Sequence, residues 1–253
     1  MLIDTHAHIL KEYYEDGIDE VIKNAKEAGI GLIINNGCDG NSNKEVIEML
    51  NKKEIYGAIG IHPEAVLNYT EEDIAYIEKN IAHEKVVAIG EIGLDYYYSK
   101  EDREEQIKLF ERQLKIAEDN NIPVIVHSRE ATEDTIKSLQ KFHIKGIIHS
   151  FSGSYETAQI YIKMGFKLGI NGVITFKNCN LKEVYKKLSL NDFVLETDSP
   201  YLTPHPYRGT KNEPKHIAEI ANFIANLYGI SLDELAEVTN RNIASIFDKI
   251  RLT

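Results

Sequence analysis

The sequence has 253 residues, of which 43% are hydrophobic and 27% are charged, and this composition excludes a largely disordered chain. The formal net charge of -11 argues against a broad basic surface for duplex DNA, but it permits a nucleic acid held in a small pocket by a metal and a few cations. The first residues lack the basic start and apolar run of a signal peptide, and no later stretch approaches the roughly 18 apolar residues of a membrane span, so we expect a cytoplasmic protein without membrane contacts.

Apolar runs alternate with amphipathic segments along the whole chain. The expected strands are residues 2–5, 30–34, 55–60, 86–90, 123–126, 145–148, 166–170 and 193–195. The expected helices are residues 17–28, 42–52, a segment from 70, a segment from 99, residues 131–141 and 181–188, and terminal helices from 213 onward. About eight such repeats predict an α/β fold, a single (β/α)8 TIM barrel domain over residues 1–253 with extra C-terminal helices. A doubly wound open sheet would give the same alternation, but its usual GxGxxG phosphate signature is absent.

The first expected strand runs into His6 and His8. Because residues two apart in an extended backbone point to the same side, the two imidazoles converge. Neutral imidazole is the commonest protein ligand for a divalent transition metal, so the pair can form half of a metal site. An isolated His-x-His is more often a hydrogen-bonding pair, and the rest of the chain must decide.

Further histidines and carboxylates stand at the ends of other expected strands. They are His62 after the third strand, Glu91 after the fourth, His127 after the fifth, His149 after the sixth and Asp198 after the eighth. The carboxyl ends of barrel strands meet at one rim, where chance would place only about one histidine. Carboxylates bordering apolar strands must be paired or bound to a cation, so the group predicts a metal centre. Taken singly, His127 and His149 would be ordinary core histidines.

The site offers four imidazoles and two carboxylates, with His62 as a further candidate ligand. This is more than one tetrahedral ion needs and suits two divalent ions. Glu91 is the expected bridge, since its strand lies between the His6/His8 side and the His127/His149 side. A two-metal site activates a water for hydrolysis, and Asp198 could both bind metal and take the proton from that water. We expect Mg2+ or Mn2+ in use, although a histidine-rich site also accepts Zn2+.

Cationic and aromatic residues near the rim suit an anionic substrate. The expected phosphate-binding cations are Arg129, Lys177, Arg208 and Lys211, the last two in a stiff, proline-rich loop. Tyr96, Tyr97 and Tyr98 follow the fourth strand, where they could stack on bases or be ordinary loop aromatics. The remaining residues with metal-binding or redox chemistry are interpreted as structural or surface histidines and free thiols: His83, His143, His216, Cys38 and Cys179.

Motifs spread over most of the chain resemble those of TatD-type deoxyribonucleases of the amidohydrolase superfamily. The matching segments are Asp4-Thr-His-Ala-His8, Gly60-Ile-His-Pro63, Gly90-Glu-Ile-Gly-Leu-Asp-Tyr96, Val126-His-Ser-Arg129, His149-Ser-Phe-Ser-Gly153, Thr175-Phe-Lys-Asn178, Glu196-Thr-Asp-Ser-Pro-Tyr-Leu-Thr-Pro204 and Arg208-Gly-Thr-Lys-Asn-Glu-Pro214. The resemblance implies a barrel whose metal ligands are His6, His8, Glu91, His127, His149 and Asp198, with His62 near the scissile phosphate and Arg129 binding phosphate. One departure is Glu64, which stands where many relatives have a histidine.

The first functional hypothesis is a metal-dependent 3′-5′ exodeoxyribonuclease acting on single-stranded DNA or 3′ ends, with no obligatory protein partner. The second is a metal-dependent amide or ester hydrolase, such as a deacylase acting on aminoacyl-tRNA, because the same activated water can attack a carbonyl. The third is an inert barrel that serves as a binding scaffold. A scaffold would be marked by lost ligands, and every expected ligand is present.

Overall fold

The computed structural model describes residues 1–14, 17–97 and 100–251. Within these residues an eight-stranded sheet runs in the order β1 to β8, with every neighbouring pair of strands parallel. The strands are β1 (Leu2–Ala7), β2 (Ile30–Asn36), β3 (Ile55–Ile59), β4 (Val86–Asp95), β5 (Val124–Arg129), β6 (Gly146–Ile148), β7 (Phe166–Ile170) and β8 (Phe193–Leu195). The predicted (β/α)8 TIM barrel is therefore confirmed.

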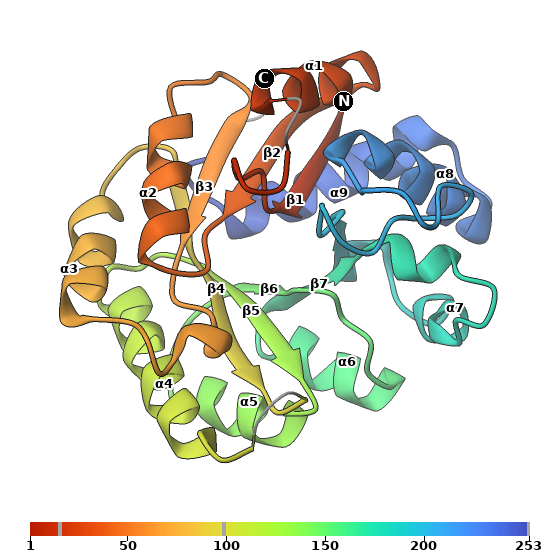
Figure 1. Cartoon of the computed structure of the whole chain (residues 1–253). Helices are drawn as coiled ribbons and strands as arrows, with labels where there is room; N and C mark the ends of the chain where they lie inside the picture. The colour runs from red at the N-terminus through yellow and green to blue at the C-terminus, as the bar shows by residue number, and fades with distance from the viewer. Residues whose placement is uncertain (15–16, 98–99, 252–253) are drawn as a thin grey trace.

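Helices α1 to α8 form a ring around the strands, as Figure 1 shows along the barrel. The helices of the described residues are α1 (Ile18–Glu27), α2 (Gly40–Met49), α3 (Glu71–Asn80), α4 (Arg103–Asp119), α5 (Thr132–Leu139), α6 (Tyr155–Lys163), α7 (Leu181–Tyr185), α8 (Ile217–Tyr228) and α9 (Leu232–Ile246). Short 3-10 helices are η1 (Pro63–Ala65), η2 (Gly172–Thr175), η3 (Leu190–Asp192) and η4 (Pro214–His216). In the described residues, none of the helices has both the length and the apolar character that a membrane crossing requires.

Several helix starts differ from the predicted ones. The second helix begins at Gly40 rather than Ser42, because the Asp39 carboxylate accepts the backbone N–H groups of Asn41 and Ser42 and so caps the helix earlier. The fourth helix begins at Arg103, four residues after the predicted start, which lies outside the described residues. Helix α6 occupies a stretch without a predicted element, since its isoleucines, threonine and tyrosines favour strands.

Four strands, β1, β2, β4 and β5, end later than predicted, which places His6 within β1 and changes where two further site residues stand. The ladder between β4 and β5 continues through the pairs Gly93 with His127 and Asp95 with Arg129. Glu91 and His127 therefore lie within their strands instead of after them. The register between the two strands is irregular between Ile89 and Ile92, on either side of Glu91.

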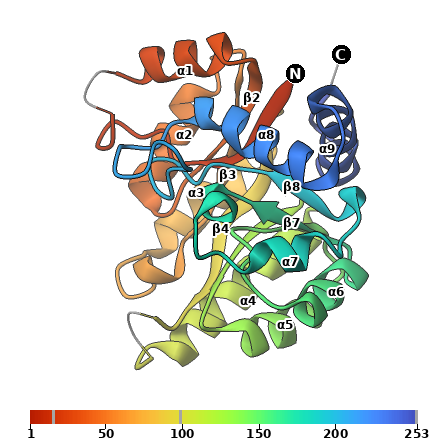
Figure 2. The same ribbon diagram turned by 90° about the vertical axis from the view of Figure 1, so that its right-hand side faces the viewer.

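Helix α9 and the residues after it close the amino-terminal end of the barrel. Ile243, Ile246 and Phe247 pack in one cluster with side chains near the starts of the strands, Ile3 and Leu32 among them. Phe247 is fully buried there. In Figure 2 this helix lies next to α8 and beside the start of β1. The opposite end of the barrel is left for the polar residues.

The barrel closes where β8 meets β1. The Asp198 N–H donates to the carbonyl of His6 at 2.9 Å, and the His8 N–H donates to the carbonyl of Ser199 at 2.7 Å. A parallel bridge joins Ala7 to Ser199. This closure, which we call the seam, is made by the same short segments that carry three of the predicted metal ligands.

Candidate metal centre

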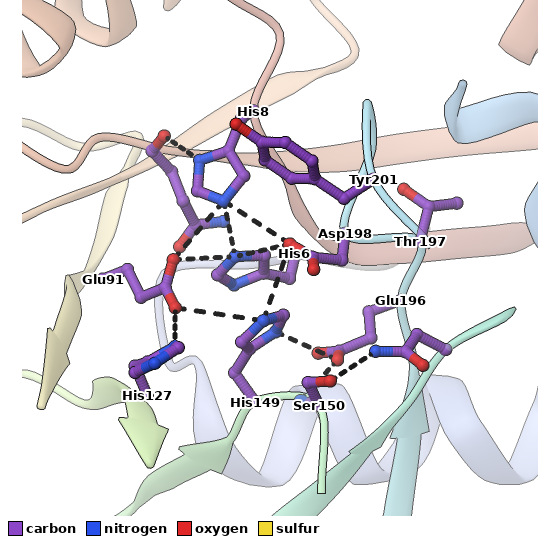
Figure 3. Close-up of polar contacts among 12 residues, drawn as sticks. His6, His8, Glu91, His127, His149, Ser150, Glu196, Thr197, Asp198 and Tyr201 are labelled. Atoms are coloured by element: carbon purple, nitrogen blue, oxygen red, sulfur yellow. Dashed lines mark hydrogen bonds and ion pairs between the residues drawn. The ribbon is translucent and has the colours of Figure 1, made fainter. Parts of the chain in front are cut away.

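A cavity of about 1010 Å3 opens at the carboxyl ends of the strands. The predicted site residues in its wall are His8, His62, Glu91, His127, Arg129, His149 and Asp198. His6 is fully buried beside the cavity, with its Nε2 atom 3.0 Å from Nε2 of His8. The structure thus brings all six predicted metal ligands and His62 together, as Figure 3 shows for the six.

The His6 and His8 side chains come from the end of β1 and the residue after it. The Nδ1 atom of His8 lies 3.0 Å from the carbonyl oxygen of Asn36, which can only accept, so Nδ1 carries the hydrogen. In the neutral ring the Nε2 lone pair then faces Nε2 of His6 and, at 3.3 Å, Oε2 of Glu91. Several lone pairs converging on one buried point fit a cation, and this donor set suits a divalent metal.

Glu91 projects from β4 with its two oxygens facing different groups of imidazoles. Oε2 lies 3.2 Å from Nε2 of His6 and 3.3 Å from Nε2 of His8, whereas Oε1 lies 2.9 Å from Nδ1 of His127. Burial opposes ionisation, but the neighbouring imidazoles, that of His6 above all, hold the pKa of Glu91 well below its usual value. The carboxylate is therefore charged, and its two oxygens could each serve as a metal ligand.

His127 stands between two carboxylates. Its Nδ1 lies 2.9 Å from Glu91, and its Nε2 lies 2.9 Å from Oδ2 of Asp95 at the end of β4. Burial opposes protonation, but the hydrogen bonds to Asp95 and Glu91 raise the pKa of His127 to about 9. Asp95 is itself held in place, because its backbone N–H and carbonyl both bond to the Gln106 amide.

His149 follows β6 and has a similar partner. Its Nδ1 lies 3.0 Å from Oε1 of the fully buried Glu196, and its Nε2 lies 3.5 Å from Oδ1 of Asp198. Burial opposes protonation, but the negative charges of Glu196 and Asp198 raise the pKa of His149 to about 10. Glu196 is fixed in turn by the Ser150 N–H, which donates to Oε1 at 2.6 Å.

Asp198 joins the two sides of the site. Its Oδ1 lies 3.7 Å from Nε2 of His6 and 3.6 Å from Nε2 of His8. Burial opposes ionisation, but the nearby imidazoles, that of His149 first, lower the pKa of Asp198 below its usual value. At neutral pH the carboxylate is therefore charged and able to accept a proton.

His62 lies on the His127 side of the cavity, where its Nε2 is 3.7 Å from Oε1 of Glu91. Burial, and then the charge of His127, lower the pKa of His62 to about 3. Its Nδ1 accepts the Glu64 N–H at 3.3 Å, so the neutral ring carries its hydrogen on Nε2. His62 is therefore a neutral hydrogen-bond donor facing the site.

In the described parts of the chain, four groups of side chains are close enough to hold a metal ion: His6 with His8 and Asp198; His62 with Glu91 and His127; His8 with Cys38 and Glu91; and His6 with His149 and Glu196. All four adjoin one another around Glu91 and the His6/His8 pair. The residues present therefore fit a metal centre.

The four predicted phosphate-binding cations are not gathered together. Arg129 lines the cavity, with its guanidinium 3.7 Å from the ring centre of Tyr97. Arg208 lies outside the cavity wall and stacks on Phe176 at 3.8 Å. Lys177 is exposed and also outside the cavity wall, and Lys211 donates to the carbonyl of Tyr13. Arg129 is thus the predicted cation placed to meet a substrate inside the cavity.

The tyrosines after β4 differ from the stacking expectation. The Tyr96 hydroxyl donates to Asp134 at 2.8 Å and its ring is buried, so it cannot meet a base. Tyr97 is exposed but has the Arg129 guanidinium against its face, and Tyr98 lies outside the described residues. Both cysteines are free thiols, and Cys38 lies nearer the site than expected, with Sγ 3.7 Å from Nδ1 of His8.

Two carboxylates that hold site histidines were not among the predicted site residues. Asp95 contacts His127, and Glu196 contacts His149. Each borders an apolar strand, which is the feature that singled out Glu91 and Asp198, so the same signal could have identified them.

The chain is similar to known proteins over nearly its whole length. The family model described as TatD related DNase matches residues 3–248. The chain is 42% identical over 252 residues to the uncharacterized metal-dependent hydrolase YabD of Bacillus subtilis, covering 98% of this chain and 99% of the relative. It is 32% identical to the uncharacterized metal-dependent hydrolase YcfH of Escherichia coli, covering 97% of this chain and 95% of that protein. The crystal structure of YjjV, a TatD homologue from Escherichia coli, superposes with a TM-score of 0.90 at 29% identity, with 98% of each chain covered.

Proposed function

Because this chain belongs to the TatD related DNase family and is a metal-dependent hydrolase, we propose that it cleaves phosphodiester bonds of DNA, removing nucleotides from the 3′ end. The proposal rests on one observation: the two oxygens of Glu91 contact different imidazoles, one the His6/His8 pair and the other His127. Arg129 lies in the wall of the same cavity. Adjacent ion positions beside a guanidinium suit a phosphodiester, whose attacking and leaving oxygens both need charge stabilisation.

The proposed metal ligands are His6, His8, Glu91, His127, His149 and Asp198. Two divalent ions, Mg2+ or Mn2+ in our proposal with Zn2+ also suited to the imidazoles, would supply Lewis-acid stabilisation and a water of lowered pKa.

The chain's own residues have separable roles in this proposal. Asp198, charged at neutral pH, accepts the proton of the attacking water at its carboxylate. His62 donates from Nε2 to a phosphoryl oxygen, and Arg129 binds the phosphate from the cavity wall. Glu91 keeps the two halves of the site at a fixed separation, because its two oxygens face different imidazoles.

A 5′-labelled single-stranded oligonucleotide tests the proposal. Metal-stripped protein should leave it intact, and added Mg2+ or Mn2+ should give a ladder that shortens from the 3′ end. Asp198→Asn should abolish the ladder, whereas Asp119→Asn, the same chemical change on the exposed face of α4, should not. Intact DNA from protein that demonstrably binds metal would show that the substrate is wrong.

One observation favours a second candidate, an ester hydrolase acting on aminoacyl-tRNA. Glu12 and Glu64 line the same cavity, and carboxylates there could accept hydrogen bonds from the charged α-amino group of an aminoacyl ester. Release of the amino acid from acylated tRNA, with DNA left intact, would favour this candidate over the nuclease.

A further inference from the structure

Two tyrosines from opposite ends of the chain meet at the mouth of the cavity. Tyr13 follows β1 and Tyr201 follows β8, and both line the cavity. The Tyr201 hydroxyl donates to the Tyr13 hydroxyl at 3.1 Å, and their rings meet edge to face with centres 5.9 Å apart. Tyr201 is 49% exposed, although its ring centre is only 6.3 Å from that of His8. Figure 3 shows the Tyr201 ring beside His8 and Asp198.

The backbone that carries Tyr201 is held firmly. Its N–H donates to the carbonyl of Asp198 at 2.8 Å, and its carbonyl accepts the Asn212 side-chain amide at 2.6 Å. The Tyr14 hydroxyl donates to the Asn212 carbonyl at 2.9 Å, which ties the β1 and β8 loops together. A half-exposed aromatic ring on a fixed backbone contributes little to the core, and such rings serve as platforms for flat ligands.

The position of Tyr201 differs from that of the tyrosines after β4. Tyr96 is buried with its hydroxyl on Asp134, and Tyr97 has Arg129 over its face. Tyr201 instead lies next to the predicted metal ligands, within one nucleotide's reach of a phosphate bound there. Its exposed ring is therefore placed to meet the group attached to a bound phosphate.

We propose that Tyr201, backed by Tyr13, is the stacking platform for the terminal nucleobase of the DNA end. This inference rests on the proposed function and adds a base-binding subsite to it. A base stacked on Tyr201 must leave its neighbour in the strand, so a paired end has to be opened first. The protein should consequently prefer an unpaired 3′ end whose last nucleotide carries a base, with tolerance for all four bases, because stacking reads only the π face.

Single-stranded oligonucleotides that end either in a normal nucleotide or in an abasic one test the subsite. Stacking on one aromatic ring predicts that wild-type protein releases the normal terminal nucleotide with roughly tenfold higher kcat/KM than the abasic one. Tyr201→Leu should bring this ratio close to one, whereas Tyr201→Phe, which keeps the ring and loses the hydroxyl, should retain it. Tyr207→Leu, a change of another exposed tyrosine outside the cavity wall, should leave the ratio unchanged.

The ratio separates stacking from a structural role. If Tyr201 only supported His8, Tyr201→Leu would slow both substrates equally, and a ratio that stays tenfold would overturn the proposal. A wild-type ratio of one would overturn it as well. If wild-type protein cleaves neither DNA, the nuclease proposal fails. Fluorescence anisotropy then measures the binding of the same oligonucleotides in the presence of Ca2+ and tests whether the base-binding subsite exists. Preference for the base-bearing end that is lost in Tyr201→Leu would support it, and equal binding of both ends by wild-type protein would refute it.

Discussion

Replacing Glu196 by glutamine removes one charge from behind a proposed metal ligand. Glu196 is fully buried, with Oε1 3.0 Å from Nδ1 of His149 and 2.6 Å from the Ser150 nitrogen. A glutamine carbonyl oxygen can accept from the same two groups, so Glu196→Gln should fold. The carboxylate charge that raises the pKa of His149 is lost, and His149 becomes a poorer electron donor at Nε2.

The size of the effect follows from this position. Carboxylates that orient a ligating histidine typically contribute about 10- to 100-fold to metal affinity, or about 1.4 to 2.8 kcal/mol. Asp95 holds His127 in the same way at 2.9 Å, so Asp95→Asn should show a loss of similar size. We expect both variants to bind Mn2+ at least about tenfold more weakly than wild-type protein.

Titration calorimetry of metal-stripped protein with Mn2+ measures this loss directly. Glu118→Gln is the matched control, because it makes the same chemical change at a side chain on α4 that accepts the His143 N–H away from the cavity. Thermal denaturation of the metal-free variants checks that each is folded. Wild-type affinity in Glu196→Gln, or an equal loss in Glu118→Gln, would refute the orienting role of this carboxylate.

Four further predictions concern the site and the fold. Glu91→Gln should abolish metal-dependent hydrolysis while circular dichroism shows an intact fold, because the group shared by both halves of the site loses its charge; retained activity would contradict the bridging role. Arg129→Ala should raise KM for DNA at least about tenfold more than KM for a neutral ester, since only the phosphate needs the guanidinium; equal changes would remove the phosphate contact. Burial raises the pKa of Asp4 to about 8 against the opposing hydrogen bonds from Thr197, so the folded state holds a proton that the unfolded chain releases near pH 4. The free energy of unfolding of metal-free protein should therefore fall by about 2 kcal/mol from pH 6 to pH 8 through this group. Urea titrations should show a smaller fall in Asp4→Asn, and an equal fall would argue against a protonated Asp4. Phe247→Ala should lower the free energy of unfolding by about 3 to 5 kcal/mol, because this buried ring helps to close the amino-terminal end of the barrel. A loss below about 1 kcal/mol in urea unfolding would show that this packing contributes little to stability.

The fold could be predicted from the sequence because the barrel repeats one unit, and a missed unit does not break the pattern. Helix α6 had no predicted counterpart, yet the neighbouring strands β6 and β7 were expected at nearly the bounds observed. The ends of elements were less predictable. The ladder that carries β4 through Glu91 to Asp95 depends on its pairing with β5, and no local sequence signal contains that information.

The candidate site was predictable to the extent that it depends on strand ends. His6, Glu91 and His149 are brought together by the parallel order of the strands, which the alternation already implied. The cations were less predictable, because loops of irregular conformation place them. Lys211 donates to a backbone carbonyl instead of entering the cavity, and only the contact between the β1 and β8 loops explains this.

The seam between β8 and β1 has a consequence for a protein that is still being made. His6 and His8 leave the ribosome well before Asp198, which follows nearly two hundred residues later in the sequence. The hydrogen bonds that join Asp198 to His6 and Ser199 to His8 form only when the last strand reaches the first. Under the proposed ligand set, an incomplete chain therefore holds a few scattered imidazoles and no hydrolytic centre. A nuclease of the proposed kind therefore cannot act on nucleic acid near the ribosome before its barrel has closed.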